Sequence, residues 1–246
     1  MDEMQQLKEA VASSSRIVFF GGAGVSTESG IPDFRSADGL YSAKKQFGAP
    51  PEELLSGPFF RANPAVFYQY YRGNLVHQDA QPNDAHKALA RLEQAGKLAA
   101  VVTQNIDGLH QMAGSHNVLE LHGSVRRNYC VRCGKRVTLE YMLDTAHDAD
   151  GAPACDSCGG LVRPDVVLYG ETLDDATVQK AVEAIESADM LIVGGTSLVV
   201  YPAAGMVGCF AGGTLALVNK SATGYDSRAD IVIHDSIGKV LAAVVD

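Results

Sequence analysis

The apolar residues of this chain follow two alternating patterns, short continuous runs and positions repeated at helical spacing. Residues 16–20 form a nearly continuous apolar run that leads straight into glycines, which is typical of a buried strand. Before it, residues 4–14 show helical spacing. Similar apolar runs predict further strands at 98–103, 117–121, 165–169, 189–194, 214–218 and 230–233.

Helical patterns separate many of these strands. One helix is expected to begin at Asn83, whose side chain can cap its N-terminus, and to stop at Gly96. Others are expected over about 174–187, 202–210 and 236–245. Strands that alternate with helices predict an α/β fold, with a parallel sheet covered by helices on both faces. Ligands are then expected at the carboxyl ends of the strands.

Two stretches interrupt this alternation. Residues 36–80 contain glycine, proline and clustered aromatic residues and predict a small helical insertion, whereas residues 124–162 contain four of the five cysteines. Both stretches are expected to be excursions from one core. A cleft between the sheet domain and a smaller lobe is therefore the expected place for a ligand.

The composition narrows the class of protein. With 246 residues and 46% hydrophobic content, the chain can bury a full core. Its net charge of −9, from 20 basic and 29 acidic residues, disfavours sequence-independent nucleic-acid binding and favours a cationic partner such as a lysine-rich protein segment. The N-terminus lacks a signal-peptide pattern, and no apolar run is long enough to cross a bilayer. We therefore expect a cytoplasmic protein without membrane or direct nucleic-acid partners.

Four cysteines form two CxxC pairs, Cys130 with Cys133 and Cys155 with Cys158, and 21 residues separate the pairs. This spacing is within one residue of the range for two knuckles that bind one tetrahedral zinc ion. Four protein ligands leave no coordination position for a substrate, so the zinc is expected to be structural. A redox-active or disulfide-linked pair of motifs is the alternative. Cys209 lies alone in an apolar stretch and is expected to be a buried small side chain.

A glycine-rich turn follows the first strand. Gly22 and Gly24 can bring backbone N–H groups close to a pyrophosphate at the start of a helix, although Thr27 stands where a dinucleotide loop has its third glycine. In a dinucleotide-binding unit an acidic residue about 20 residues later usually binds the ribose, but lysines occupy that position in this chain. A turn without a nucleotide therefore stays an alternative at this point.

Later segments carry polar side chains suited to a ligand. In one loop Phe34 can cover an aromatic ring and Arg35 can bind phosphate, unless Arg35 forms only a structural pair with Asp33. Residues 103–107 end a strand with amide and carboxylate side chains, which can bind ribose hydroxyls and a carboxamide. His122 ends the next strand, where it can act as a base, whereas the other histidines are expected to be structural.

Together, these segments resemble the ordered motif set of the sirtuin family, and they cover nearly the whole chain, as in compact prokaryotic members. The motifs are GAGVS (22–26), GIPDFR (30–35), TQNID (103–107), LHG (121–123), the four cysteines, RPDVVLYGE (163–171) and GTSLVVYP (195–202). The resemblance implies a Rossmann-type domain and a small zinc-binding lobe. The expected division is a large NAD-binding domain (1–35, 81–123 and 163–246), a helical insertion (36–80) and a zinc-binding module (124–162).

The resemblance also implies the site residues. Asn105 and His122 are the expected catalytic residues, with His122 as the base. The expected NAD contacts are Gly22, Ala23, Gly24, Thr27, Asp33, Phe34, Arg35, Gln104, Ile106, Asp107, Thr196, Ser197, Asn219 and Ile237. The acyl-lysine peptide is expected to bind as an added strand between two segments of the chain. Its expected contacts are Val167, Tyr169, Gly170, Glu171, Leu198 and Val199. The expected zinc ligands are Cys130, Cys133, Cys155 and Cys158.

The reaction that the resemblance implies removes acetyl groups from protein lysines and consumes NAD, giving nicotinamide, O-acetyl-ADP-ribose and free lysine. A protein mono-ADP-ribosyltransferase, in which another nucleophile captures the ribose, and a non-catalytic NAD-binding zinc module are the alternatives. His122 and the expected tunnel for the acyl-lysine, of which Val167 and Tyr169 form part, favour deacylation over the first alternative. The presence of Asn105, Asp107 and His122 together argues against the second.

The helical insertion bears on the choice of acyl group. Relatives that remove succinyl or malonyl groups carry a Tyr-x-x-Arg pair there. In this chain Tyr68 is followed by Tyr71 at the arginine position and by Arg72 one residue later. One residue turns a helix by about 100°, so Arg72 is expected to miss the acyl tunnel. Acetyl-lysine is therefore expected to be a better substrate than succinyl-lysine.

Overall fold

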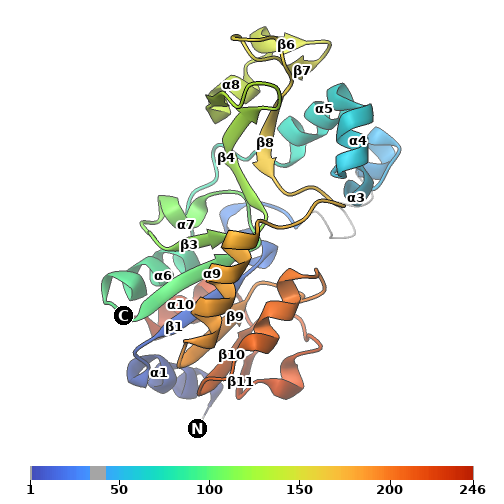
Figure 1. Ribbon diagram of the computed structural model, residues 1–246. Coiled ribbons are helices and arrows are strands. Elements are labelled where there is room, and N and C mark those ends of the chain that lie inside the picture. The colour runs from blue at the N-terminus through green and yellow to red at the C-terminus, as the bar shows by residue number, and fades with distance from the viewer. Residues whose placement is uncertain (1, 34–42, 246) are drawn as a thin grey trace.

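A parallel β-sheet forms the centre of the computed structural model, which describes residues 2–33 and 43–245 (Figure 1). Its six strands stand in the order β11–β10–β9–β1–β2–β3, and all neighbours are parallel. The expected parallel sheet is therefore confirmed. The strands are β1 (Ile17–Gly21), β2 (Leu98–Thr103), β3 (Val118–Glu120), β9 (Met190–Gly194), β10 (Thr214–Val218) and β11 (Ile231–Ile233).

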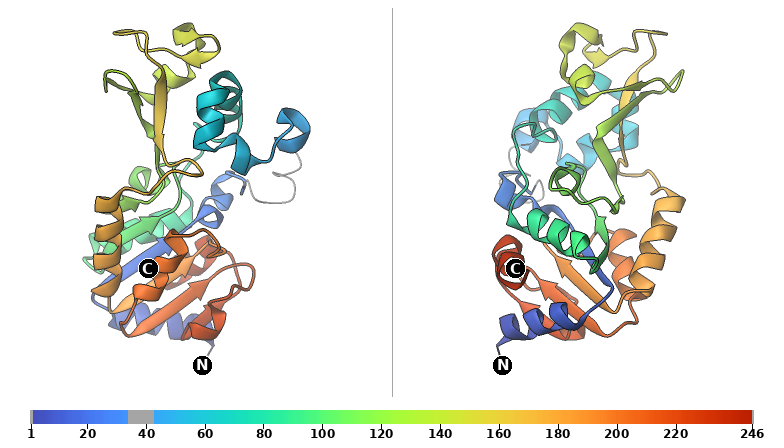
Figure 2. Two further views of the ribbon diagram at one scale, coloured as in Figure 1. Left: turned by 45° about the vertical axis from the view of Figure 1, so that its right-hand side comes forward. Right: turned by 90° about the vertical axis from the view of Figure 1, so that its left-hand side faces the viewer.

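Helices cover both faces of this sheet, as the sequence predicts. On one face α1 (Glu3–Ser13), α6 (Asp84–Gln94) and α10 (Ile237–Val244) share a core with alternate residues of β1, such as Phe19. On the other face α9 (Asp175–Glu186) packs against the intervening residues, such as Phe20. The right-hand view of Figure 2 shows α9 and α10 on opposite sides of the sheet. Both faces of the strands are buried, so their sequences are continuous apolar runs.

The boundaries of α6 follow the expected capping chemistry. The Asn83 side chain accepts a hydrogen bond from Ala85 N at 2.9 Å, and Gly96 after the last turn has a left-handed φ of 72°. The helix expected over 202–210 is a 3-10 helix, η4 (Ala203–Cys209), which completes the second layer. Shorter helical segments are η1 (Ala23–Val25), η2 (Thr27–Ser29), α7 (Leu109–Met112) and η5 (Asp226–Arg228).

A smaller lobe stands beyond the carboxyl ends of β1 and β2, and β4 and β8 lead into it (Figure 1). It contains a three-stranded sheet, β5 (Arg136–Val137), β4 (Gly123–Cys130) and β8 (Val162–Val166), and the helices α3, α4 and α5. These two parts share one hydrophobic core. The remaining bounds are α3 (Pro51–Leu54), α4 (Gly57–Ala62), α5 (Pro64–Asn74), α8 (Leu139–Leu143), η3 (Thr145–His147), β6 (Asp148–Ala149) and β7 (Ala152–Pro153).

Polar contacts join the helices of the lobe to its cysteine-containing part. Arg72 on α5 forms two hydrogen bonds with the Asp148 carboxylate, both at 2.7 Å, and donates a third to Met142 O at 2.8 Å. Tyr68, also on α5, donates from its hydroxyl group to Val162 O. These contacts attach α5 to the segment between the two cysteine pairs, through Arg72, and to β8, through Tyr68.

The strand expected over 165–169 requires a correction. The strand in this region is β8, which begins at Val162, ends at Val166 and pairs antiparallel with β4 instead of joining the large sheet. Its alternating burial, with Val162, Pro164 and Val166 inside, is that of a strand with one exposed face. The apolar residues that follow Val166 line a cavity, which explains their strand-like sequence. Within the described ranges, no helix is long and apolar enough to span a membrane.

Candidate functional site

A cavity of about 270 Å³ opens between the sheet domain and the smaller lobe. It lies at the point where the strand order changes direction, because β1 is followed outward by β2 and β3 on one side and by β9, β10 and β11 on the other. Among the expected site residues, the lining includes Ala23, Gln104, Asn105, Ile106, Asp107, His122, Val167, Tyr169, Gly170 and Glu171. Residues drawn from four separate sequence motifs therefore meet in one cavity.

The glycine-rich turn packs tightly against the loop after β9. Gly24 donates its backbone N–H to Gly195 O at 2.8 Å, and a Cβ atom on Gly24 would lie 2.7 Å from Gly195 Cα. Thr27 donates from its hydroxyl group to Gly24 O at 3.0 Å, so its side chain closes the turn. Gly22 also lies close to this loop, because a Cβ atom there would be 3.0 Å from Thr196 Cβ.

A chain of hydrogen bonds runs along the wall of the cavity through Asn105, Ser26 and Asp107. Asn105 Nδ2 donates to Ser26 Oγ at 3.0 Å, and Ser26 Oγ donates to Asp107 Oδ2 at 2.7 Å. Asp107 Oδ1 accepts from Leu109 N at 2.8 Å. The carboxylate and amide are thus held in fixed orientations. Ser26 was not among the expected site residues, although it ends the glycine motif and lines the cavity.

A second set of hydrogen bonds joins the loops after β2, β9 and β10. Gln104 Nε2 donates to Thr196 Oγ1 at 3.1 Å, and Thr196 N donates to Asn219 Oδ1 at 2.9 Å. Leu198 N also donates to Thr196 Oγ1, at 3.2 Å. Thr196 therefore connects the Gln104 segment to the loop that contains Leu198. The Nδ2 atom of Asn219 is buried and has no partner within the described ranges.

His122 lines the cavity from the turn between β3 and β4. Its Nδ1 atom lies 2.9 Å from Gln104 O. A carbonyl oxygen can only accept, so Nδ1 carries the hydrogen and donates it to Gln104 O. The lone pair of the neutral imidazole is then on Nε2, which can accept a proton from a ligand.

The segment after β8 forms the opposite wall, and backbone hydrogen bonds hold it on two sides. Val167 N donates to His122 O at 3.0 Å, and Tyr169 N donates to Leu55 O at 2.9 Å. Glu171 forms two hydrogen bonds with Arg163, both at 2.9 Å. Burial favours a higher pKa for Glu171, but the hydrogen bonds from Arg163 and from Leu168 N outweigh it and lower the pKa of this carboxyl group. Glu171 is therefore an ionised residue held by a cation.

The other expected contacts that fall within the described residues do not line this cavity. Ile237 is buried in the core at the start of α10, beside Gly194, and Val199 is 65% exposed. Phe34 and Arg35 lie outside the described residues. Sequence reasoning missed several lining residues, mostly apolar ones with no chemical signature of their own. They are Ser26, Ile31, Pro32, Leu55, Asn74, Leu75, His77, Val166, Leu168, Leu173, Val200, Tyr201 and Pro202.

The orientation of α5 differs from the expected one in one respect. Arg72 is paired with Asp148 and does not line the cavity, as expected. Tyr71, which was expected to occupy the position facing the acyl group, does not line it either. Its side chain is fully buried and stacks on Phe67 with ring centroids 5.9 Å apart. The residues of α5 and its C-terminus that reach the cavity are Asn74 and Leu75.

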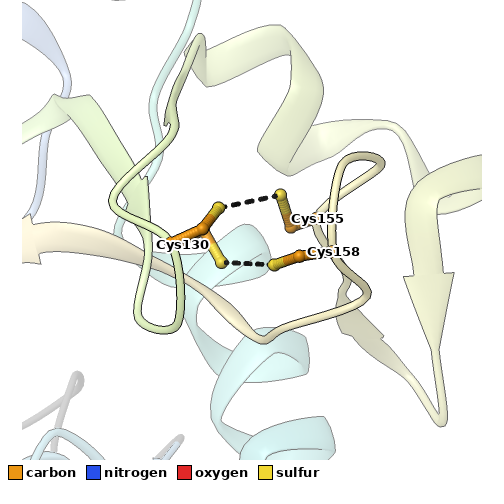
Figure 3. A group of neighbouring side chains, drawn as sticks. Cys130, Cys155 and Cys158 are labelled. Atoms are coloured by element: carbon orange, nitrogen blue, oxygen red, sulfur yellow. Dashed lines mark hydrogen bonds between the residues drawn. The ribbon is translucent and has the colours of Figure 1, made fainter.

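The four paired cysteines converge in the smaller lobe. Figure 3 shows Cys130, Cys155 and Cys158 pointing into a common space. Cys130 Sγ lies 3.5 Å from Cys158 Sγ, Cys133 Sγ lies 3.8 Å from Cys155 Sγ, and all four sulfurs lie within 4.8 Å of one another. Zinc–sulfur bonds of about 2.3 Å in a tetrahedron place sulfurs about 3.8 Å apart, so the four thiolates fit one zinc ion. A disulfide requires about 2.05 Å, which excludes the disulfide alternative here.

Comparisons with known proteins agree with this architecture. The model of the Sir2 family matches residues 22–202. A protein of Clostridium acetobutylicum named NAD-dependent protein deacetylase is 59% identical, over 100% of this chain and 99% of that protein. One of Clostridium perfringens with the same name is 57% identical, over 100% and 99%.

Solved structures are similar as well. A Sir2 protein with a p53 peptide and NAD⁺ has a TM-score of 0.86 at 37% identity, over 98% of this chain and 96% of that one. A Sir2 protein bound to a propionylated peptide has the same TM-score, identity and coverage. A family model that spans most of the chain and relatives of such identity leave one conclusion. This chain belongs to the Sir2 family.

Proposed function

We propose that this protein removes acetyl groups from protein lysines in a reaction that consumes NAD. The observation that carries the proposal is the orientation of His122, whose Nδ1 donates to Gln104 O and whose Nε2 can accept a proton at the cavity. The same cavity contains the fixed Asn105–Ser26–Asp107 chain, and its lining includes a run of apolar residues, 166–168. A base, an oriented amide and an apolar channel are the groups that NAD-dependent deacetylation requires.

The dinucleotide would lie across the switch point of the sheet. Gly22, Ala23, Gly24 and Thr27 would lie beside its pyrophosphate in the turn around η1, with Asp33, Phe34 and Arg35 from the following loop. Gln104, Ile106 and Asp107 would hold the nicotinamide and its ribose. Thr196, Ser197, Asn219 and Ile237 would contact the remainder, and the buried, unpartnered Nδ2 of Asn219 supports a polar ligand there.

NAD supplies an electrophilic ribose carbon with nicotinamide as its leaving group. The chain's residues would bind and orient the two substrates and move one proton. The walls around Val167 and Tyr169 hold the acyl-lysine and exclude water, and Asn105 orients the reacting groups. The acetyl amide oxygen would displace nicotinamide from the ribose carbon, and His122 Nε2 would then accept the proton of a ribose hydroxyl whose oxygen attacks the acetyl carbon. One water molecule would complete the transfer, because the amide oxygen stays on the ribose carbon while lysine leaves as the free amine. The products are nicotinamide, O-acetyl-ADP-ribose and free lysine.

The protein substrate would bind as an extended peptide between two loops. Gly170 and Glu171 would contact one side of it and Leu198 and Val199 the other, through backbone hydrogen bonds that place little demand on sequence. Val199 is 65% exposed, so a peptide can reach it. We also propose a cytoplasmic location, because zinc-bound thiolates are typical of reducing compartments.

Separate segments of the chain would form the NAD-binding domain and the smaller lobe. We propose that residues 1–35, 81–123 and 163–246 form the NAD-binding domain, and that residues 36–80 and 124–162 form the helical insertion and the zinc module. The zinc ion would hold the loops between the cysteine pairs and take no part in the reaction, because its four ligands leave no open position. The shared core of the insertion and the cysteine module supports a common role as the lobe that closes the cavity.

One experiment tests the proposed function. The purified protein is incubated with NAD and matched acetyl, succinyl and unmodified lysine peptides, and the products are identified by mass spectrometry. Deacetylation predicts equal amounts of nicotinamide, O-acetyl-ADP-ribose and free-lysine peptide. A peptide that gains ADP-ribose would instead identify an ADP-ribosyltransferase, and the absence of nicotinamide release would identify a binding module.

A further inference from the structure

The small-lobe strand β4 contains a bulge at its entry from the large sheet. In the antiparallel pairing with β8, Ser124 is opposite Asp165, but Asn128 is opposite Pro164. Residues 125–127 therefore fall outside the pairing and form what we call the β4 bulge. A bulge turns side chains away from the regular pleat, and bulges are frequent beside active sites.

The first half of the β4 bulge contacts the segment that carries Asp107. Val125 N donates to Ile106 O at 3.0 Å, and Arg126 Nε donates to Asp107 O at 3.2 Å. Gly108 has a φ of 76°, and a Cβ atom there would lie 2.6 Å from Arg126 Nε. The bulge thus forms the outer support of a segment whose side chains face the cavity.

Arg127, the last residue of the bulge, contacts residues on both sides of the turn that contains His122. Its Nε donates to Asp165 Oδ2 on β8 at 2.9 Å, and its NH1 group donates to Glu120 Oε2 at the end of β3. The Glu120 side chain is only 7% exposed, so this end of the ion pair is shielded from solvent. One guanidinium therefore connects the end of the large sheet to both long strands of the small one.

The turn that contains His122 and Gly123 is also held in place by β8 and the segment after it. Val167 N donates to His122 O, and Gly123, with a φ of 77°, lies so close to Asp165 O that any Cβ atom would collide with it. A small shift of β8 relative to β3 would therefore move His122. Arg127 is the side chain whose ion pairs oppose that shift.

We propose that Arg127, acting through Glu120 and Asp165, is a positioning residue for His122. This inference rests on the proposed function, because it assumes that His122 is the base. Arg127 does not line the cavity in which both substrates are proposed to bind. Its removal should therefore slow the chemical step and leave substrate binding nearly intact. Lysine should restore only part of the effect, because a single ammonium group cannot reproduce the fork that reaches two carboxylates.

The test compares Arg127→Gln with wild type, with Arg127→Lys, and with Arg136→Gln, which removes an exposed arginine from β5 of the same sheet. We expect kcat with acetyl-peptide to fall about 10–100-fold in Arg127→Gln, since a misplacement of about 1 Å can cost that much. KM for NAD and for peptide should change less than about threefold, and Arg136→Gln should match wild type. Combining Arg127→Gln with Glu120→Gln should give little further loss, because the two residues act through one contact.

The alternative outcomes are distinct. An active wild type with an unchanged kcat in Arg127→Gln, a loss confined to KM, or fully additive effects in the double variant would overturn the inference alone. A wild type without turnover would overturn the proposed function and this inference with it. If Arg127→Gln does not fold, Asp165→Asn removes one of the two carboxylates at a half-exposed position, and a wild-type kcat in that variant would overturn the inference.

Discussion

Gly24 donates its backbone N–H to the carbonyl oxygen of Gly195 at 2.8 Å, and this bond joins the loops that follow β1 and β9. Gly195 has a φ of 60°, and a Cβ atom on it would collide with Val25 N. The loops after these two neighbouring central strands therefore pack backbone against backbone at Gly24 and Gly195. This close approach fixes the shape of the turn beside which the pyrophosphate is proposed to bind.

Replacing Gly195 with Ala should therefore damage the NAD site. We expect a loss of stability greater than the roughly 1–2 kcal/mol of a left-handed alanine, because the methyl group also forces the Gly24 turn to move. The affinity for NAD should fall with it. Gly96→Ala is the matched control, since Gly96 has a φ of 72° and open space around its Cα. Thermal unfolding and NAD titration of both variants measure the difference; equal effects would mean that the contact is unimportant.

His122→Ala should lower turnover far more than it weakens NAD binding. A general base typically contributes about 10²–10⁴-fold, and the hydrogen bond from Nδ1 to Gln104 O orients the ring without holding the dinucleotide. Steady-state kinetics and NAD titration separate the two effects. His116→Ala, at an exposed position, is the control. Near wild-type turnover in His122→Ala would contradict the proposed role.

Removal of zinc should unfold the smaller lobe and abolish activity indirectly. The four cysteine sulfurs lie within 4.8 Å of one another, and zinc binding at such a site contributes folding free energy. Cys133→Ser should reduce zinc content and melting temperature together, whereas Cys209→Ser should change neither. Metal analysis and thermal unfolding provide the measurements. Full activity in a zinc-free protein would disprove the structural role.

Acetyl-lysine should be processed much better than succinyl-lysine. The described residues that line the cavity include no lysine or arginine, so a succinyl carboxylate would be buried without a cation. Because Leu75 lines the cavity and Tyr71 does not, Leu75→Arg should raise succinyl activity relative to acetyl. Gln69→Arg adds the same charge on the exposed side of α5 as a control. Values of kcat/KM for matched peptides decide the point, and a wild-type preference for succinyl would refute it.

Two buried histidines should make the protein sensitive to acid. Burial lowers the pKa of His86 from 6.5 to about 4, against the opposing effect of Asp107, and burial together with His86 lowers that of His110 to about 3. Between pH 6.5 and these values the unfolded chain binds protons that the folded protein does not. Stability is therefore complete above pH 6.5 and falls as the pH decreases toward about 4 and then about 3.

The variant His110→Leu tests this origin of the acid sensitivity. The ring nitrogens of His110 have no partner within the described ranges, so leucine removes the titration and leaves no other group unpaired. We expect the decline in melting temperature between pH 6.5 and pH 4 to become shallower. The exposed His116→Leu variant should keep the wild-type slope. Identical slopes in all three proteins would assign the acid sensitivity to other groups.

The sequence determined the secondary structure that depends on local patterns. Continuous apolar runs predicted β1, β2, β9 and β10, because a strand buried on both faces requires apolar residues at every position. Asn83 and Gly96 marked the ends of α6 through capping chemistry that involves only near neighbours. The two CxxC pairs predicted the cysteine cluster for the same reason, since each knuckle is local. The sequence did not show how one CxxC pair comes close to the other, because that depends on the tertiary fold.

Tertiary structure decided the features that depend on partners distant in the chain. The apolar run after Pro164 looks like a buried strand, yet β8 ends at Val166 because its partner is β4 and the next residues line a cavity. Four aromatic residues of α5 are buried, Phe67, Tyr68, Tyr70 and Tyr71, so helical phase alone could not assign Tyr71 to the core and Leu75 to the cavity. The contacts of Arg127 with Glu120 and Asp165 likewise depend on a bulge. No local pattern specifies them, because pairing register is set by the whole sheet.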